Sequence, residues 1–396
     1  MQSNFELPQA RDARIDLFRG FALLAIFIDH VPSSVLVLLT PHAFAFSDAG
    51  ELFFFLSGFV SALVYGKTLR QSGFVAATLR IWRRAWTLYI AQILLLFFLI
   101  AEVSLGVIKT GDLSYHAFFR SADFILQPDL ASLHALLLGF QPAYLDIIPC
   151  YIIFLLGFPL VLAALARSAC FALIPSFALY LGVQVFGWNL VTFPRDDGWF
   201  FDPLAWQFLF VLGAAFGSGR LASAGRVLSD RRIVRIAAAL TLVIGTIQLS
   251  TTLHTIWPSV PALLSSALPI DKSTLAPLRL VSFFALAVVA RRLLQPGSRF
   301  LGTDIARGIS RCGRHSLSVF CLGVVLAIMG YMLLEQLGRA PTDQLFVAGA
   351  GIAILIAAAR GLDWLSLAFQ SAESSRFTHQ PAALSARPFS NGPAMR

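Results

Sequence analysis

A histidine and an arginine in the first apolar segment are spaced so that they share one face of a helix. His30 follows Arg19 by eleven residues, which in a helix is three turns plus roughly 20°, or about 16 Å along the axis. Ionisable side chains are costly inside a membrane-spanning segment and therefore indicate a function. The pair suits a long anionic ligand that enters beside Arg19 and ends near His30, whose imidazole can act as a general base. The structural alternative is a histidine that only hydrogen-bonds a neighbouring helix.

Two acidic residues begin the second apolar segment, one helical turn apart. Asp48 and Glu51 precede Ser57 and Gly58, a pair of small residues that permits close contact with another helix. Asp29 lies about 100° from His30 on the same helix, which is a poor position for orienting that imidazole. A carboxylate from another helix, Glu51 or Asp48, is therefore the better candidate for stabilising the imidazolium.

Basic residues gather where two predicted spans meet the inner side. Arg80, Arg83 and Arg84 stand among tryptophans before the third span. Arginine binds phosphate with two hydrogen bonds and stacks on adenine, so the cluster favours a nucleotide-type cofactor. His315, at the inner end of the ninth span, is either a further cofactor contact or part of an ordinary inner loop. For all of these residues the alternative is the excess of positive charge that inner loops carry.

A third set of polar and aromatic residues lies at the outer ends of later spans. Its members are Tyr144, Asp146, Trp206, Gln207 and Arg279. Aromatic rings stack on sugar rings, and aspartate and glutamine hydrogen-bond hydroxyl groups, so the set predicts an outer cleft that binds a sugar. The aromatic belt of membrane proteins is the alternative explanation for the tyrosine and the tryptophan.

The amino-acid composition indicates the class of protein in which these residues lie. Of the 396 residues, 57% are hydrophobic and 13% are charged, and the mean hydropathy is +0.76. Soluble domains carry about twice this share of charge, so an ordinary soluble enzyme, a disordered protein and a disulfide scaffold are excluded. The net charge of +9 would suggest nucleic-acid binding only if a polar basic domain existed, and none does. The chain is predicted to be an all-α polytopic membrane protein.

About 20 apolar residues span the hydrocarbon core as a helix. Ten stretches qualify or come close: 17–40, 50–66, 82–103, 145–166, 169–189, 202–219, 233–253, 276–294, 316–335 and 344–362. The predicted organisation is a cytoplasmic segment over 1–16, a transmembrane domain over 17–365 and a disordered cytoplasmic tail over 366–396.

The distribution of charge predicts the orientation. If the N-terminus is inside, 24 of the 30 Lys and Arg residues fall on inner segments, as the positive-inside rule requires. Both termini are therefore expected in the cytoplasm, and no cleavable signal peptide is visible. The four cysteines lack metal-ligand spacing and are interpreted as packing residues, so no metal site is predicted.

The chain resembles the OpgC family, which succinylates osmoregulated periplasmic glucans, within the acyltransferase type 3 group. The wider group is matched by Arg19 with His30, by Glu51 before Phe53–Phe54 and Ser57–Gly58, and by the arginine-rich turn. The narrower family is matched by Arg14–Gly20, Gln141–Asp146, Asp202–Gly213, Asp271–Arg279 and Cys312–Phe320. One departure is visible, because Ser282 stands where a histidine is expected.

The resemblance implies a bacterial inner-membrane enzyme that moves an acyl group, succinyl above all, from cytoplasmic acyl-CoA to glucan hydroxyls. It implies that His30 is the catalytic base or a transient acyl carrier and that Glu51 is its acidic partner. Arg19 and the Arg80–Arg84 cluster would contact the CoA. Beyond the glucan and the lipid bilayer, no nucleic acid or tightly bound cofactor is expected.

A transporter or flippase is the rival hypothesis, in which His30 and Glu51 relay protons and the arginines bind an anionic substrate. Repeated halves and paired broken helices, typical of transporters, are not evident. An assembly protein of the envelope is a third hypothesis. It does not explain why Arg19 and His30 share one face of a helix.

Overall fold

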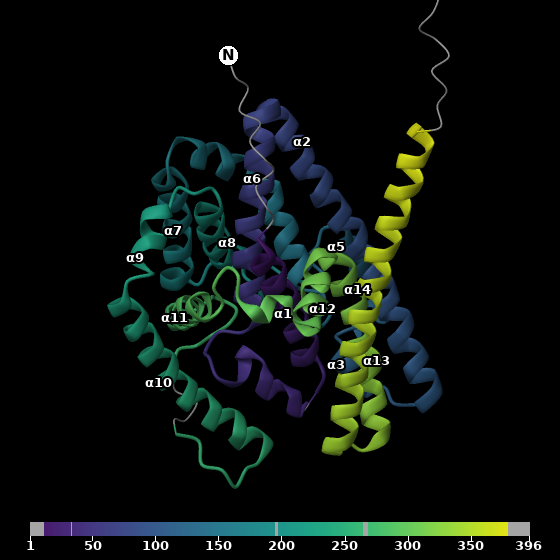
Figure 1. The fold of residues 1–396 in the computed structure, drawn as a ribbon. Coiled ribbons are helices and arrows are strands. Elements are labelled where there is room, and N and C mark those ends of the chain that lie inside the picture. The colour runs from purple at the N-terminus through teal and green to yellow at the C-terminus, as the bar shows by residue number, and fades with distance from the viewer. Residues whose placement is uncertain (1–11, 33, 195–196, 264–267, 379–396) are drawn as a thin grey trace, which may run out of the picture.

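The computed structural model describes residues 12–32, 34–194, 197–263 and 268–378, and these residues form helices and connecting loops with no strand (Figure 1). The long helices are α1 (Ala13–His30), α2 (Ala49–Thr110), α6 (Ile147–Arg167), α7 (Ala169–Phe186), α8 (Pro203–Gly217), α10 (Arg231–Ile256), α11 (Pro277–Leu293), α12 (Asp304–Arg314), α13 (Ser316–Leu337) and α14 (Pro341–Thr378). The shorter ones are η1 (Val35–Leu39), η2 (Pro41–Ala43), α3 (Ser114–Phe118), α4 (Ala122–Leu126), α5 (Pro128–Leu136), α9 (Ala222–Val227) and η3 (Arg299–Gly302).

The first predicted span, 17–40, is wrong in its second half. Helix α1 ends at His30, and Val31 is extended, with φ −85° and ψ 113°. Pro32 explains the break, because a proline disfavours the helical conformation in the residue before it. The chain continues through the two short 3₁₀ helices η1 and η2. His30 is therefore the last residue of a helix and does not lie in the middle of a longer one.

The second and third predicted spans belong to one helical element of 62 residues. Helix α2 has a single non-helical residue, Gly73, with φ 83° and ψ 177°. Glycine adopts positive φ without the strain that a Cβ causes, so the chain changes direction there without a loop. Figure 1 shows α2 rising to a turn and descending again. The predicted inner loop between these two spans is helical.

Six helices of the described chain are long and apolar enough to cross a membrane: α2, α6, α7, α10, α13 and α14. The protein is therefore embedded in a membrane. The other predicted spans coincide with shorter or more polar helices, namely α1, α8 and α11. Helix α11 has 17 residues and is seen almost end-on in Figure 1, whereas α6, α13 and α14 run up the picture.

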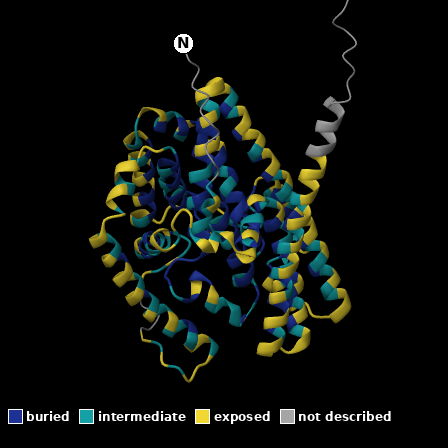
Figure 2. Ribbon diagram, in the orientation of Figure 1, coloured by how far each residue is buried: buried dark blue, intermediate teal, exposed yellow. Residues whose placement is uncertain are grey.

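Apolar side chains cover the outside of the bundle as well as its centre. In Figure 2 the buried residues gather at the centre, and the outward faces of α10 and α14 are mostly exposed. Only 11% of the most apolar window of α10 is buried by protein. Exposed apolar residues on helices of this length indicate contact with lipid, because a helix that crosses the hydrocarbon core needs about 20 predominantly apolar residues.

Helix α14 extends beyond the predicted end of the membrane domain. It continues to Thr378, so residues 366–378, which were predicted to belong to a disordered tail, are helical. The rest of that predicted tail, 379–396, and residues 1–11 of the N-terminal segment lie outside the described residues.

Glycines allow two helix pairs to approach at backbone contact. A Cβ on Gly58 of α2 would lie 1.9 Å from the Phe210 carbonyl oxygen of α8, and a Cβ on Gly313 of α12 would lie 1.9 Å from the Asp16 carbonyl oxygen of α1. Small residues at such crossings let membrane helices pack by close van der Waals contact. The two crossings hold α1 and the start of α2, the elements that carry His30, Asp48 and Glu51.

Replacing Gly313 with Ala is expected to destabilise the protein by about 1–3 kcal/mol, because the new methyl group overpacks the α1–α12 crossing. The measurement is denaturant unfolding in detergent micelles. Gly349→Ala in α14, where nothing lies within 4 Å of the added Cβ, is the matched control and should leave stability almost unchanged. Equal stability of the two variants would contradict the packing assigned to Gly313.

Candidate active site

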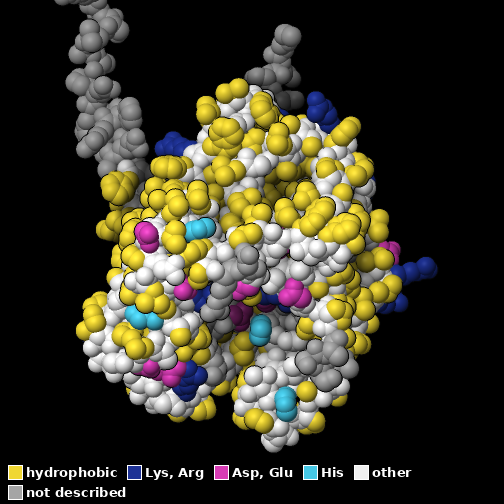
Figure 3. Space-filling model, turned by 180° about the vertical axis from the view of Figure 1, so that it is seen from behind, with side chains coloured by type: hydrophobic (Ala, Val, Ile, Leu, Met, Phe, Trp, Pro, Cys, Tyr) yellow, Lys and Arg dark blue, Asp and Glu magenta, His cyan; other side chains and the backbone are white. Residues whose placement is uncertain are grey.

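His30 lines a small cavity where the ends of several helices converge. The cavity has a volume of about 50 Å³, and its ionisable lining residues are Asp29, His30, Asp48, Asp146 and Lys272. These come from the end of α1, the start of α2, the start of α6 and the loop before α11. Figure 3 shows acidic, basic and histidine side chains gathered around a hollow on the face opposite that of Figure 1. The fold thus brings together ionisable groups from four separate segments.

The His30 side chain is held by packing, and its ring nitrogens remain available. The Tyr144 ring lies 4.2 Å from the imidazole, between ring centroids, and the Tyr144 hydroxyl donates to the His30 carbonyl oxygen at 2.9 Å. Asp29 accepts a hydrogen bond from Thr40 at 2.7 Å. No hydrogen bond from another described residue occupies either imidazole nitrogen. The ring can therefore accept a proton from a molecule in the cavity.

Four charged side chains form a buried ion network beside the cavity. Arg279 Nε donates to Glu51 Oε1 at 2.7 Å, and Arg279 Nη2 lies 3.2 Å from Asp48 Oδ2. Lys272 Nζ lies 2.7 Å from the same oxygen of Asp48. Glu51 is 0% exposed, and charges this deeply buried require partners. The network joins the start of α2 to the start of α11.

The start of α2 is also capped by this pair of acids. Asp48 accepts from the Gly50 N–H at 2.7 Å, and Glu51 accepts from the Asp48 N–H at 2.8 Å. This reciprocal arrangement is a capping box, which satisfies backbone donors that a helix start leaves free. Glu51 thus pairs with Arg279 and caps its own helix. Of the two predicted acidic partners, Asp48 is the one that lines the cavity with His30.

Lys272 brings a positive charge to the cavity. Burial acts to lower the pKa of Lys272, but the Asp48 carboxylate outweighs it, and the pKa lies above its ordinary value. The side chain is therefore an ammonium at neutral pH. Its nitrogen also lies over the rings of Phe200 and Phe201, 5.4 and 5.2 Å from their centroids, which favours the charged form through cation–π attraction.

Two residues predicted to bind sugar form hydrogen bonds with other parts of the protein. Trp206 is fully buried, and its indole N–H donates to the carbonyl oxygens of Lys272 and Ser273 at 3.1 and 3.0 Å. Gln207 exchanges hydrogen bonds with Ser176 of α7. Arg279, from the same predicted set, belongs to the ion network. These three side chains position loops and helices, whereas Asp146 lines the cavity and Tyr144 packs against His30.

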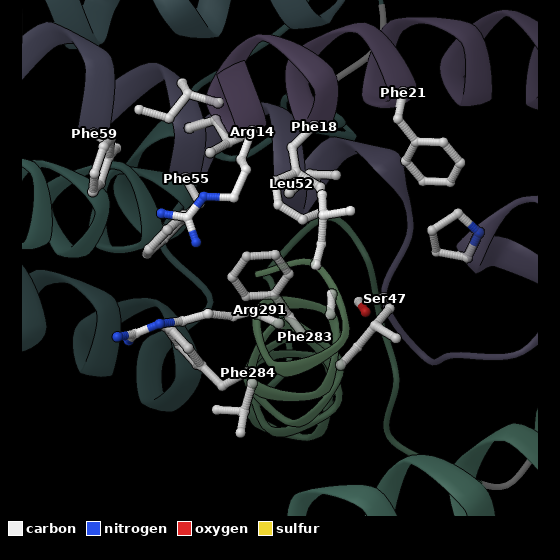
Figure 4. Close-up of a pocket in the computed structure, with 18 of the residues that line it drawn as sticks. Arg14, Phe18, Phe21, Ser47, Leu52, Phe55, Phe59, Phe283, Phe284 and Arg291 are labelled. Carbon is white, nitrogen blue, oxygen red and sulfur yellow. The ribbon is translucent and has the colours of Figure 1, made fainter. Parts of the chain in front are cut away.

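A much larger cavity, of about 590 Å³, lies between α1, α2 and α11. Its walls are mostly apolar, with Phe residues from all three helices, and Asp48 lines it as well as the His30 cavity. Figure 4 shows the guanidinium groups of Arg14 and Arg291 at one end and Ser47 at the opposite end. The cavity is thus an apolar slot with two cations at one end and the wall of the histidine cavity at the other.

The charge at the arginine end is partly balanced. Arg14 Nε donates to Asp12 Oδ1 at 2.9 Å, and Nη2 donates to Oδ2 at 2.6 Å. The hydrogen bond from Arg14 holds the pKa of Asp12 below its ordinary value. Arg291, which is exposed, donates to the Gly225 carbonyl oxygen at 3.2 Å.

The predicted cofactor contacts do not line this slot. Arg19 donates to Ser316 at the start of α13. Arg80 bonds Thr68 across the bend of α2, Arg83 is exposed and Arg84 is half-buried. His315 lies 2.8 Å from Asp363 of α14. These residues lie on the inner segments of the predicted topology without meeting in one described cavity.

The sequence prediction gave no specific role to Lys272, Arg14 or Arg291. Lys272 lies in the segment Asp271–Arg279, which was predicted to border an outer cleft, and the structure places its side chain at the His30 cavity. Arg14 and Arg291 were interpreted as inner-loop charges. Asp29 was set aside for its poor angle to His30, yet it lines the same cavity.

Comparison with known proteins identifies one family. The family described as OpgC protein matches residues 11–367 of the chain. No curated protein and no solved structure matches the chain. The matched residues include every helix that lines the two cavities.

Proposed function

The chain belongs to the OpgC protein family, and from this premise we propose that it is an O-acyltransferase of the bacterial inner membrane. It transfers an acyl group, succinyl in our proposal, from a cytoplasmic CoA thioester to a hydroxyl group of a periplasmic glucan. The observation that carries the proposal is the cavity in which the His30 imidazole meets acidic groups and Lys272. Acyl transfer needs a base for the hydroxyl proton, and His30 has ring nitrogens available for that task.

His30 acts as general base on the acceptor. The glucan hydroxyl enters the small cavity, where the carboxyl groups of Asp29 and Asp146 bind neighbouring hydroxyls and Phe200 packs on the sugar ring. The imidazole takes the hydroxyl proton while the oxygen attacks the thioester carbonyl carbon. The same proton then passes to the departing thiolate. Tyr144, whose ring is tilted against the His30 ring at 4.2 Å between centroids, holds the imidazole in position for both transfers.

The flexible arm of the CoA donor, which joins its phosphates to the thioester, occupies the large apolar slot. The arginine end binds the negatively charged phosphates, since guanidinium groups favour phosphate. The phenylalanine walls contact the arm. The far end reaches Asp48, which also lines the His30 cavity, so the thioester arrives beside the acceptor. Arg14 and Arg291 are thus the proposed phosphate contacts in the slot, whereas Arg19, Arg80, Arg83, Arg84 and His315 lie outside it.

The experiment that tests the proposal is mass analysis of periplasmic glucans from cells with and without the protein. The expected result is a set of mass increments of one acyl group each, present only when the protein is expressed. Glucans of identical mass in both strains, with the protein inserted in the membrane, would contradict the proposal. A change in the amount of exported glucan without any change in mass would favour a transporter.

Filling the slot should block the donor. Ala287 of α11 lines the slot, and Ala287→Trp is expected to weaken binding of succinyl-CoA by about tenfold or more, because the indole occupies the space of the arm. The measurement is calorimetric titration of purified protein. Val281→Trp, on an exposed position of the same helix, is the control and should bind as the wild type does. Equal binding by both variants would exclude the slot as the donor site.

A further inference from the structure

Lys272 is the one cation among the described residues that line the His30 cavity. Its ammonium has three N–H donors, and in the described chain its ion-pair partner is Asp48 Oδ2, at 2.7 Å. The side chain is 31% exposed. Donor capacity therefore remains for a molecule in the cavity.

The loop that carries Lys272 is held by four hydrogen bonds from side chains to its backbone carbonyl oxygens. Trp206 donates to the carbonyl oxygens of Lys272 and Ser273. Gln184 donates to the Thr274 carbonyl oxygen at 2.7 Å and Tyr180 to the Leu275 carbonyl oxygen at 3.0 Å. Buried side chains of α7 and α8 thus immobilise a short loop. Such immobilisation is what a catalytic charge needs if it is not to reorganise during the reaction.

The other polar groups around the cavity do not offer a free donor of this kind. Asp29, Asp48 and Asp146 are carboxyl groups, which as carboxylates only accept hydrogen bonds. The N–H groups of Asp48 and Gly50 at the start of α2 are bonded to Glu51 and Asp48. These two N–H groups are therefore engaged by the caps of the helix and are not available to an oxyanion.

We infer that the Lys272 ammonium stabilises the oxyanion that forms on the thioester carbonyl during transfer. The inference rests on the proposed function. As the acceptor oxygen forms its bond to the carbonyl carbon, the hydroxyl proton moves to His30 and the carbonyl electron pair moves to oxygen, next to Lys272. The oxyanion then collapses, the carbon–sulfur bond breaks, and the thiolate takes the proton from His30. Atoms and charge balance without any further reactant.

A purely structural role is the competing explanation, in which Lys272 only neutralises Asp48. Arg279 also lies 3.2 Å from that carboxylate and pairs with Glu51. The carboxylates of the network therefore keep a buried cation when Lys272 is replaced. A neutral substitution at Lys272 is thus expected to fold.

The first test is Lys272→Met, which keeps an unbranched side chain of nearly the same length and removes the charge. The expected result is a fall in kcat of about 10²–10³-fold, as for loss of an oxyanion donor, with KM values for thioester and glucan little changed. Lys109→Met, at an exposed position near the end of α2, is the control and should keep the wild-type kcat. An unchanged kcat in Lys272→Met, or a rise in KM alone, would overturn the inference.

The second test separates catalysis from folding. In Lys272→Ala, added methylammonium should restore part of the transfer rate in a saturable manner, because it returns a charged N–H donor to the site. Tetramethylammonium, which has the charge but no N–H donor, should restore none. Rescue by neither ion, together with loss of thermal stability, would assign Lys272 a structural role only. Absence of transfer by the wild-type protein itself would instead contradict the proposed function.

Discussion

Replacing His30 with Ala is expected to lower acyl transfer to the glucan by about 10²–10⁴-fold, the usual contribution of a general base. Within the described cavity, His30 is the side chain with a near-neutral ordinary pKa and with ring nitrogens that no described residue occupies. The measurement is the rate of ester formation on purified glucan with succinyl-CoA as donor. Binding of succinyl-CoA should persist, because the slot is lined by other residues.

A second histidine provides the matched control for this variant. His42 lies in η2 and is exposed, and it lines neither cavity. The His42→Ala variant should transfer acyl groups at the wild-type rate. If the His30→Ala variant is folded and equally active, the catalytic assignment fails.

Replacing Arg279 with Ala is expected to destabilise the protein by about 3–5 kcal/mol, the cost of leaving a buried charge without its partner. Arg279 is 7% exposed and Glu51 is 0% exposed, so water cannot replace the lost guanidinium. Lys272 pairs with Asp48 and leaves Glu51 unpaired in the described network. The capping box at the start of α2 would be weakened by the same change. The measurement is the free energy of unfolding in mixed micelles.

An exposed ion pair provides the comparison. Arg307 and Asp304 form a salt bridge at 2.7 Å with side chains 54% and 88% exposed, and exposed pairs contribute little to stability. The Arg307→Ala variant should therefore unfold as the wild type does. Equal stability of the two arginine variants would mean that the buried network does not hold α11 to α2.

Composition and apolar run length were sufficient to predict a helical membrane protein. They could not locate the interruptions, which depend on single residues. Pro32 ends α1 after His30 by a local steric effect, and Gly73 bends α2 without ending it. Run length also cannot distinguish a spanning helix from α11, which lies crosswise to α6, α13 and α14 in Figure 1.

The candidate site could be predicted only in part. The phase of Arg19 and His30 depends on local helix geometry, and α1 is continuous between them. Contacts between distant segments could not be predicted in this way. The pairing of Glu51 with Arg279, and the position of Lys272 beside Asp48, join residues more than 200 positions apart. Periodicity carries no information about such pairs, because tertiary packing decides them.

Transfer in liposomes that contain the purified protein tests the central claim most directly. Labelled succinyl-CoA is supplied on one side of the bilayer and glucan on the other, and label bound to glucan through an ester is measured. The account predicts repeated turnovers with the wild-type protein and a loss of at least about 10²-fold with His30→Ala. Unlabelled glucan after incubation with folded wild-type protein, whether or not glucan crosses the bilayer, would contradict it.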